Sequence, residues 1–237
     1  MSKPRIIAID GPAASGKTTL ARRLAQALGY AFFDTGVLYR AVTWAALQKG
    51  EDLQDEARMT LLARTLDVEL RTTETGETLV WLQGRDATQE LYSPQVDAWV
   101  SVVAAHPGVR QALKDVQRRL ALQGHIVVVG RDIGTVIVPE ADMKIYLDAS
   151  LEERARRRYE EARRKGHSVT LEQVLKDMAR RDALDASRAT APLRPAEDAY
   201  VLQTNGLSAD EVFEKVMQWM RKKFPNSNKT PAPSATS

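Results

Sequence analysis

Short apolar runs alternate with amphipathic stretches along most of the chain, and this alternation predicts an α/β protein with a parallel sheet. The run at 6–9 (IIAI) is followed by Gly-Pro and indicates a buried strand. A helical period follows over 17–28 and ends at Gly29. We expect further strands at 31–34, 125–129, 143–147 and 200–203, and further helices at 38–47, 55–66, 95–122 (interrupted by Pro107-Gly108), 150–165, 170–183 and 209–224.

Between residues 68 and 83 the hydrophobic period changes from that of a helix to that of a strand. Residues 68–73 and 78–83 alternate around Glu74-Thr75-Gly76-Glu77, which predicts a β-hairpin that a third short strand could extend. An antiparallel piece inside an α/β chain indicates an insertion or small subdomain. Residues 225–237 are polar and rich in Pro and Ser, and we expect them to be disordered.

The start signals of two helices are also visible. Ser150 with Glu153 before the helix at 150–165, and Thr170 with Gln173 before the next, fit the capping-box pattern, in which the two side chains exchange hydrogen bonds with each other's backbone. We therefore expect both helices to begin at these residues.

Composition excludes several kinds of site. The 237 residues carry a net charge of only +3, which suits a cleft for small anions as well as it suits nucleic acid. There is no Cys, which excludes disulfides and thiolate metal sites, and His106, His125 and His167 are widely separated. No signal peptide or long apolar stretch is evident, so we expect a soluble cytoplasmic protein.

Residues 11–18 carry the strongest chemical signal. They read GPAASGKT, the G-x-x-x-x-G-K-[ST] phosphate-binding loop, and they lie between a predicted strand and a predicted helix. Glycines let backbone N–H groups approach phosphate oxygens, and the helix N-terminus favours the same anion. Lys17 would contact the β- and γ-phosphates, and Thr18 would hold Mg²⁺. A nucleoside triphosphate site is therefore predicted.

Three classes of nucleotide-binding protein remain at this point. A GTPase switch needs Asn-Lys-x-Asp, and Asn228-Lys229 is followed by Thr-Pro in the polar tail, which argues against a switch. An ATPase that acts on nucleic acid could use Asp132, at the end of an apolar strand, as its acidic residue. A small-molecule kinase needs a second, arginine-rich anion site facing the γ-phosphate.

Arginines occur where such a second site would form. Arg40 and Arg131 follow strands, and the carboxyl ends of parallel strands meet at one edge of the sheet. Arg181 and Arg188 flank the end of the helix at 170–183, and the helix before it holds Arg154, Arg156, Arg157, Arg158, Arg163 and Arg164. Arginine forks match phosphate oxygens in pairs. The sequence therefore offers a second anion site, at which a molecule that accepts the γ-phosphoryl group could bind.

The same arginines have a simpler interpretation. Glu152 with Arg156, Glu153 with Arg157 and Glu160 with Arg164 are spaced i,i+4, as on a solvated helix face. Asp185 and Arg188 could likewise form a salt bridge at a helix end. Ser101 and Arg110 are ordinary helix residues by pattern alone.

Three long segments together resemble the bacterial cytidylate kinases. They are DTGVLYR (34–40), GRDIGTVIVPEADMKIYLDAS (130–150) and RRDALDASRATAPLRPAEDA (180–199), in that family's order behind the GPAASGKTT loop. The resemblance covers about residues 4–224. It implies a three-layer P-loop NTPase fold, with a core at 1–34, 124–150 and 199–224. It also implies a nucleoside monophosphate-binding region with a β insertion at 35–123 and a lid at 151–185.

The resemblance also implies a reaction and a set of site residues. The reaction is ATP with CMP or dCMP giving ADP with CDP or dCDP, with Mg²⁺. Separately from the resemblance, we expect no nucleic-acid partner, no membrane partner and a monomeric enzyme. Lys17, Arg131, Arg157 and Arg188 would be catalytic, with Arg156 and Arg158 as other candidates in the lid. ATP would contact Gly11, Pro12, Ala13, Ala14, Ser15, Gly16, Lys17, Thr18 and Thr19, with Thr18 on the metal. The acceptor would contact Thr35, Arg40, Ser101, Arg110, Arg131, Asp132, Arg181, Asp185 and Arg188.

Cytosine chemistry agrees with that assignment. Cytosine offers an amino donor beside two acceptors, which an Asp acceptor and an Arg donor complement, whereas uracil would place a carbonyl against Asp132. Two alternatives stay open at this point: a kinase for another small acceptor, such as a different nucleoside monophosphate or shikimate, and a nucleic-acid-binding ATPase.

Overall fold

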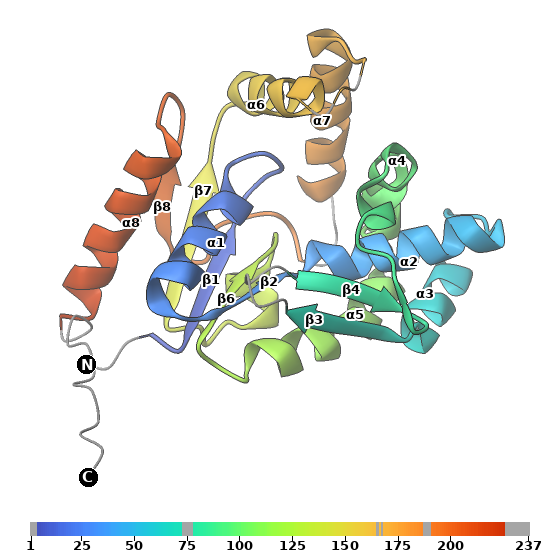
Figure 1. Cartoon of the computed structure of the whole chain (residues 1–237), viewed down its shortest axis with the longest axis horizontal. Coiled ribbons are helices and arrows are strands. Elements are labelled where there is room, and N and C mark those ends of the chain that lie inside the picture. Colours follow the sequence, from blue (N-terminus) through green and yellow to red (C-terminus); the bar gives the residue numbers. More distant parts are fainter. Residues whose placement is uncertain (1–3, 73–77, 165, 167, 187–190, 226–237) are drawn as a thin grey trace.

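A five-stranded parallel sheet organises the protein in the computed structural model, which describes residues 4–72, 78–164, 166, 168–186 and 191–225 (Figure 1). The strand order is β2-β6-β1-β7-β8. β1 lies at the centre, with Ile7 opposite Val127 on one side and Met143 on the other. The strands are β1 (Ile6–Asp10), β2 (Ala31–Asp34), β6 (Ile126–Val129), β7 (Met143–Asp148) and β8 (Tyr200–Gln203).

Both faces of the sheet are covered by helices, which explains the continuous apolar runs in the sequence. Ile7 and Ile9 pack in a core with α1 (Lys17–Leu28) and α8 (Ala209–Lys223). Ile6 and Ala8, which alternate with them, pack in a second core on the opposite face. The second core also takes in buried residues of α2 (Gly36–Lys49), α3 (Glu56–Thr65), α4 (Pro94–Val103) and α5 (Pro107–Ala121).

The predicted hairpin is present, with the third strand. β3 (Val68–Thr72), β4 (Thr78–Leu82) and β5 (Arg85–Asp86) form an antiparallel sheet in that order, beside α2 and α3 in Figure 1. Val80 and Leu82 are buried in the core beneath α2. The turn at 73–77 lies outside the described residues. A short 3₁₀ helix, Glu90–Tyr92, leads from the small sheet into α4.

Two helices stand apart above the carboxyl ends of the strands, α6 (Leu151–Arg164) and α7 (Leu171–Ala186) (Figure 1). They share a small core of Ala155, Val174 and Met178, and Ala13 and Ala14 of the phosphate loop pack against it. The predicted lid therefore touches the loop through apolar side chains.

The helix-start predictions have different outcomes. Thr170 and Gln173 form the reciprocal capping box, with hydrogen bonds of 3.0 and 3.2 Å. At α6 only half of the box exists: Ser150 Oγ accepts from Glu153 N, but Ser150 N donates to Asn205 Oδ1. The Glu153 carboxylate is instead occupied by two arginines of its own helix, as described below.

Other boundaries agree within about two residues in most elements. The interruption expected in the helix over 95–122 is present, but it lies at residues 104–106, and Pro107-Gly108 begin α5 instead of separating the two helices. A π-helical turn at Ile133–Ile137, after Gly-Arg-Asp, was not predicted. Among the described residues, no helix is long and apolar enough to cross a membrane. The tail prediction falls on residues 226–237, outside those described.

The packing of α1 against the sheet gives a first prediction. Leu24 is fully buried between α1 and the strands, so Leu24→Ala should lower the free energy of unfolding by about 2–5 kcal/mol. Urea unfolding followed by circular dichroism measures this change. Leu61→Ala, at a position 56% exposed on α3, is the matched control and should change it by less than about 0.5 kcal/mol. Equal losses in both variants would contradict the assigned core.

Candidate active site

The phosphate loop has the conformation its glycines predict. Gly11 has φ +144°, and a Cβ there would collide with the Leu147 carbonyl oxygen, so only glycine fits. Gly16, at the N-cap of α1, has φ +95° and leaves the helix N-terminus without a capping side chain. An anion at this end would therefore find unoccupied helix N–H groups.

Lys17 is held inside this loop. Its Nζ donates to the Pro12 carbonyl at 2.6 Å, and the side chain is buried. Burial, followed by the nearby Arg131, sets the pKa of Lys17 well below its ordinary value. A phosphate dianion at the loop would favour the charged ammonium and raise this pKa again.

Oxygen ligands suited to Mg²⁺ lie beside the loop. Thr18 Oγ1 is exposed and lies 3.4 Å from Asp34 Oδ2, at the end of β2. Hydroxyl and carboxylate oxygens are the donors that Mg²⁺ prefers. Thr18 was predicted from the motif, whereas the proximity of Asp34 to Thr18 is visible only in the fold.

A cluster of cations faces the loop from the neighbouring strand and from the lid. Arg131 Nε donates to Asp185 Oδ2 at 2.9 Å, and Nη1 donates to the Gly11 carbonyl at 3.2 Å. Arg181 Nε is buried and has no hydrogen-bond partner among the residues that the structure describes. Burial lowers the pKa of Arg181 to about 10, and the positive charge of Arg131 makes the second largest contribution to this lowering. Two guanidinium groups held close together mark a place where an anion is stabilised.

Arg40 is fixed on the other side of this cluster. It donates to the Leu91 carbonyl at 2.9 Å and to Asp97 Oδ1 at 2.7 Å, and its guanidinium lies over the Tyr92 ring. Asp97 also accepts from Arg158 of the lid at 2.6 Å. Three further N–H groups of Arg40 are not used by these bonds, so its fork can still serve a phosphate.

A buried ion pair lies next to Arg131. Arg110 Nη2 and Asp132 Oδ2 are 2.5 Å apart, both side chains are less than a tenth exposed, and Arg110 Nη1 also donates to the Ala104 carbonyl. Ser101, on α4, is also buried. Thr35 was predicted to contact the phosphate-accepting substrate. Its hydroxyl donates a hydrogen bond to the Val129 carbonyl at 2.9 Å, which links the end of β2 to β6.

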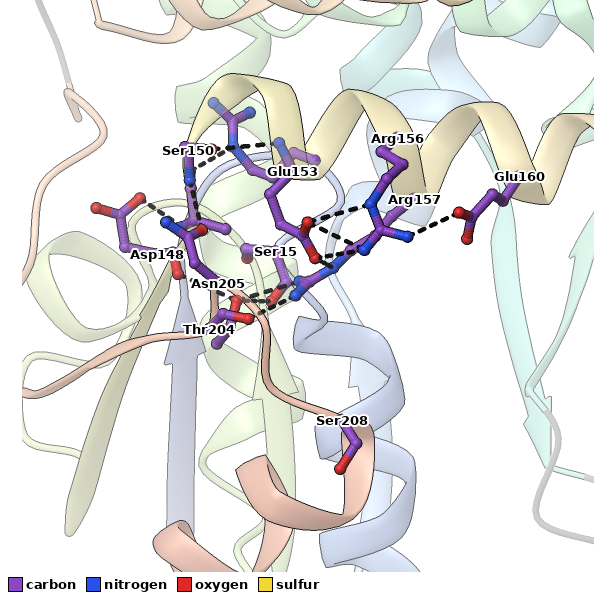
Figure 2. A network of polar contacts seen from close by, with 12 residues as sticks. Ser15, Asp148, Ser150, Glu153, Arg156, Arg157, Glu160, Thr204, Asn205 and Ser208 are labelled. Atoms are coloured by element: carbon purple, nitrogen blue, oxygen red, sulfur yellow. Dashed lines mark hydrogen bonds and ion pairs between the residues drawn. The ribbon is translucent and has the colours of Figure 1, made fainter.

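The lid arginines divide into distinct groups, which Figure 2 shows in part. Arg156 pairs with Glu153 and Glu160 of its own helix, as on a solvated face. Arg157 also contacts Glu153, but its guanidinium reaches Thr204, with Nη2 2.6 Å from the carbonyl oxygen. Buried Arg154 contacts Asp182 at 2.6 Å and the Ala13 carbonyl at 3.4 Å. Of the three expected i,i+4 pairs, Glu153 with Arg157 is confirmed. Among the described contacts, Arg156 pairs with Glu153 and Glu160 instead of Glu152, and Arg164 Nε donates to the backbone carbonyl of Glu160.

Arg157 also forms one wall of a pocket of about 160 Å³ beside the phosphate loop. The loop and α1 form a second wall, and the segment between β8 and α8 forms a third. Its lining residues are Ser15, Gly16, Thr19, Leu20, Arg157, Thr204, Leu207, Ala209 and Val212. Because Thr204 Oγ1 also lies 3.4 Å from the Ser15 carbonyl, the wall is joined to the loop (Figure 2).

The family profile described as cytidylate kinase matches residues 7–222 of this chain. The chain belongs to the cytidylate kinase family. It is 44% identical over 223 residues to the cytidylate kinase of Bacillus licheniformis, covering 94% of this chain and 99% of that protein. It is 47% identical over 220 residues to that of Herpetosiphon aurantiacus, covering 92% and 94%.

A solved structure of an uncharacterised protein from Eubacterium ventriosum shows the fold alone. The identity is 12% and the TM-score 0.50, with 93% of this chain and 99% of that chain covered. The family profile and the two curated relatives confirm the resemblance to the cytidylate kinase family that the sequence motifs indicated.

For this cytidylate kinase family member, the structure brings most of the predicted residues to one edge of the sheet. Arg188 lies outside the described residues. Sequence reasoning missed Asp10, whose buried carboxylate accepts hydrogen bonds from Ile133 N and Gly134 N, both at 2.8 Å. Burial raises the pKa of Asp10 to about 6, against the lowering effect of these two bonds. Its only sequence signal is its place immediately before the phosphate loop.

The buried ion pair gives a second prediction. Asp132→Ala would leave the Arg110 charge buried and unpaired, so the free energy of unfolding should fall by about 3 kcal/mol or more. Denaturant unfolding at neutral pH measures it. Asp210→Ala removes the partner of Arg23 at a site where the Asp210 side chain is 85% exposed, and should change it by less than about 1 kcal/mol. Similar values for the two variants would show that the 110–132 pair is solvated.

Proposed function

We propose that the chain catalyses transfer of the γ-phosphoryl group of ATP to CMP or dCMP, giving ADP with CDP or dCDP in the presence of Mg²⁺. The observation that supports it best is the buried Arg110–Asp132 pair immediately beside Arg131. A carboxylate acceptor and a guanidinium donor, which a cytosine base could use, would thus lie beside the arginine that contacts the phosphate loop. Family membership supports the same reaction.

The donor half of the site would be built from residues 11–19. Backbone N–H groups of the loop and the Lys17 ammonium would hold the β- and γ-phosphates. Thr18 and Asp34 would hold Mg²⁺, which when bound neutralises charge on the phosphate oxygens. The pocket bordered by Arg157 suits the donor base, because a guanidinium plane stacks on an aromatic ring. We therefore propose a base-binding role for Arg157, in addition to the catalytic role expected from sequence.

The acceptor phosphate would be held by Arg40 and Arg131, with Arg188 as the third predicted cation. Arg181 and Asp185 would face the sugar. The support for this is electrostatic: Arg131 has one carboxylate partner in Asp185, and Arg181 Nε is buried with no hydrogen-bond partner in the described part of the chain. A phosphate monoester would supply the missing negative charge and acceptor oxygens.

The acceptor base would be recognised by Asp132, Arg110 and Ser101. A carboxylate accepts from the cytosine amino group, and a guanidinium donates to its ring acceptors. Uracil presents a carbonyl in place of that amino group, so Asp132 would meet an acceptor. A site built to hydrogen-bond one group can reject an analogue that lacks it by up to about 10⁴–10⁵-fold.

The chemistry would proceed without a covalent enzyme intermediate. An oxygen of the CMP phosphate attacks the γ-phosphorus in line, the bond to the β,γ-bridging oxygen breaks, and the cations stabilise the charge that spreads over the transferring group. The lid at 151–185 would exclude water, so that transfer prevails over hydrolysis. We assign residues 35–123 to acceptor binding and the strands with α1 and α8 to the core. We also propose a monomeric, cytoplasmic enzyme, as expected from the sequence.

A coupled assay of ADP release with Mg-ATP tests the function directly. CMP, dCMP, UMP, AMP and dTMP are offered in parallel, and we expect fast turnover with CMP or dCMP only. Slow, equal hydrolysis in every tube, or stimulation by oligonucleotides with a steep salt dependence, would contradict the proposal and favour an ATPase that acts on nucleic acid. Turnover with a different acceptor would reassign the second site.

Two single variants test the roles of the cations. Lys17→Ala and Arg131→Ala should each lower kcat/KM by at least about a hundredfold, because each removes charge stabilisation of the transferring group. Circular dichroism should show an unchanged fold. Arg156→Ala is the control, since its guanidinium is paired only within α6 among the described contacts, and it should retain activity within about threefold. An active Lys17→Ala variant would refute the donor site.

A further inference from the structure

The turn after Asp132 has an unusual arrangement of hydrogen bonds. Asp132 is the N-cap residue of the π-helical turn Ile133–Ile137, with φ −145° and ψ 26°. An aspartate at this position ordinarily accepts hydrogen bonds from the first N–H groups of its own helix. Asp132 makes no such bond, because its carboxylate is paired with Arg110 instead.

The N–H groups left open by Asp132 are satisfied from another strand. Asp10, the last residue of β1, accepts from Ile133 N with Oδ1 and from Gly134 N with Oδ2, each at 2.8 Å. Asp10 lies 123 residues away in sequence and reaches the turn because β1 pairs with β6 in parallel, Ile9 opposite Val129. All three groups are buried, so water cannot replace these bonds.

We propose that Asp10 is a positioning residue that caps the turn in place of Asp132 and so leaves the Asp132 carboxylate free to pair with Arg110 and recognise the acceptor base. Without Asp10, the two buried N–H groups need another acceptor, and the Asp132 carboxylate is the one adjacent to them. Turning toward its own helix would withdraw Asp132 from Arg110. The part of this inference that concerns recognition of the acceptor base by Asp132 rests on the proposed function.

The position of Asp10 between β1 and the phosphate loop also links the two halves of the site. Gly11 follows Asp10 directly and begins the phosphate loop, and its carbonyl accepts from Arg131. The residue that ends β1 therefore fixes the strand leading into the donor loop and the turn that carries the acceptor residues. Gly134 suits the contact, because a Cβ there would crowd the Lys144 side chain at 3.1 Å.

Asp10→Asn tests the proposal, because the amide keeps the shape but opposes an N–H₂ group to one of the two N–H donors. We expect kcat/KM for CMP to fall about tenfold or more and the CMP-to-UMP preference to shrink, with KM for ATP within about twofold of the parent. Asp142→Asn is a matched control. Asp142 Oδ2 accepts from Arg5 N and Ile6 N, both at 2.8 Å, at the opposite end of the same strand.

The control separates positioning from general loss of stability. Asp142→Asn should weaken the fold without changing the CMP-to-UMP ratio. If Asp10→Asn lowers CMP and UMP turnover by the same factor, the proposal is overturned. If Asp10→Asn does not fold, Asp10→Ser, which keeps one acceptor, is measured in the same way.

A measurement that needs no activity distinguishes failure of this inference from failure of the proposed function. In a double-mutant cycle on unfolding, Asp10→Asn and Asp132→Asn should be non-additive, because the second change acts on a carboxylate already displaced by the first. Additive effects would overturn the inference even in an enzyme that phosphorylates CMP. Non-additive effects in a protein inert toward CMP would retain the capping role and reject the substrate.

Discussion

Concentrated positive charge at the carboxyl edge of the sheet is the constraint on which the rest of the site depends. Lys17, Arg131 and Arg181 are held close enough to lower the pKa of Lys17 and of Arg181, in addition to the effect of burial. Removing such groups from water is unfavourable unless counter-charges are near. A bound phosphate group would reduce this repulsion between cations, and part of its binding energy would come from that reduction.

Carboxylates from separate elements keep these cations in place. Asp185 of α7 holds Arg131, Asp97 of α4 holds both Arg40 and Arg158, and Asp182 of α7 holds Arg154. Each pair joins two elements that the sheet alone would not align. The guanidinium groups consequently have fixed orientations before any nucleotide arrives, which reduces the ordering needed on binding.

The sequence predicted the features that local pattern encodes and missed those that depend on contacts between distant residues. The phosphate loop, its flanking strand and helix, and the hairpin follow from short-range periodicity and glycine positions. The π-helical turn could not be predicted, because its cap comes from Asp10, 124 residues away from Gly134. The box at Ser150 was half wrong because Asn205 and two arginines compete for its groups. Arg40, Arg110 and Asp132 could be named as candidate site residues from the sequence, but the residues with which they form hydrogen bonds could not.

The packing of Ala13 and Ala14 against the small core of the lid restricts two positions that the phosphate-loop motif leaves open. In G-x-x-x-x-G-K-T any residue is nominally allowed there, since the motif concerns backbone conformation and the anion. In this chain the methyl groups at these positions meet α6 and α7, so larger side chains would push the lid outward. The residues at these two positions of the loop and those of the α6–α7 core are therefore coupled by steric fit, and a phosphate loop with larger residues there would no longer fit α6 and α7 of this chain.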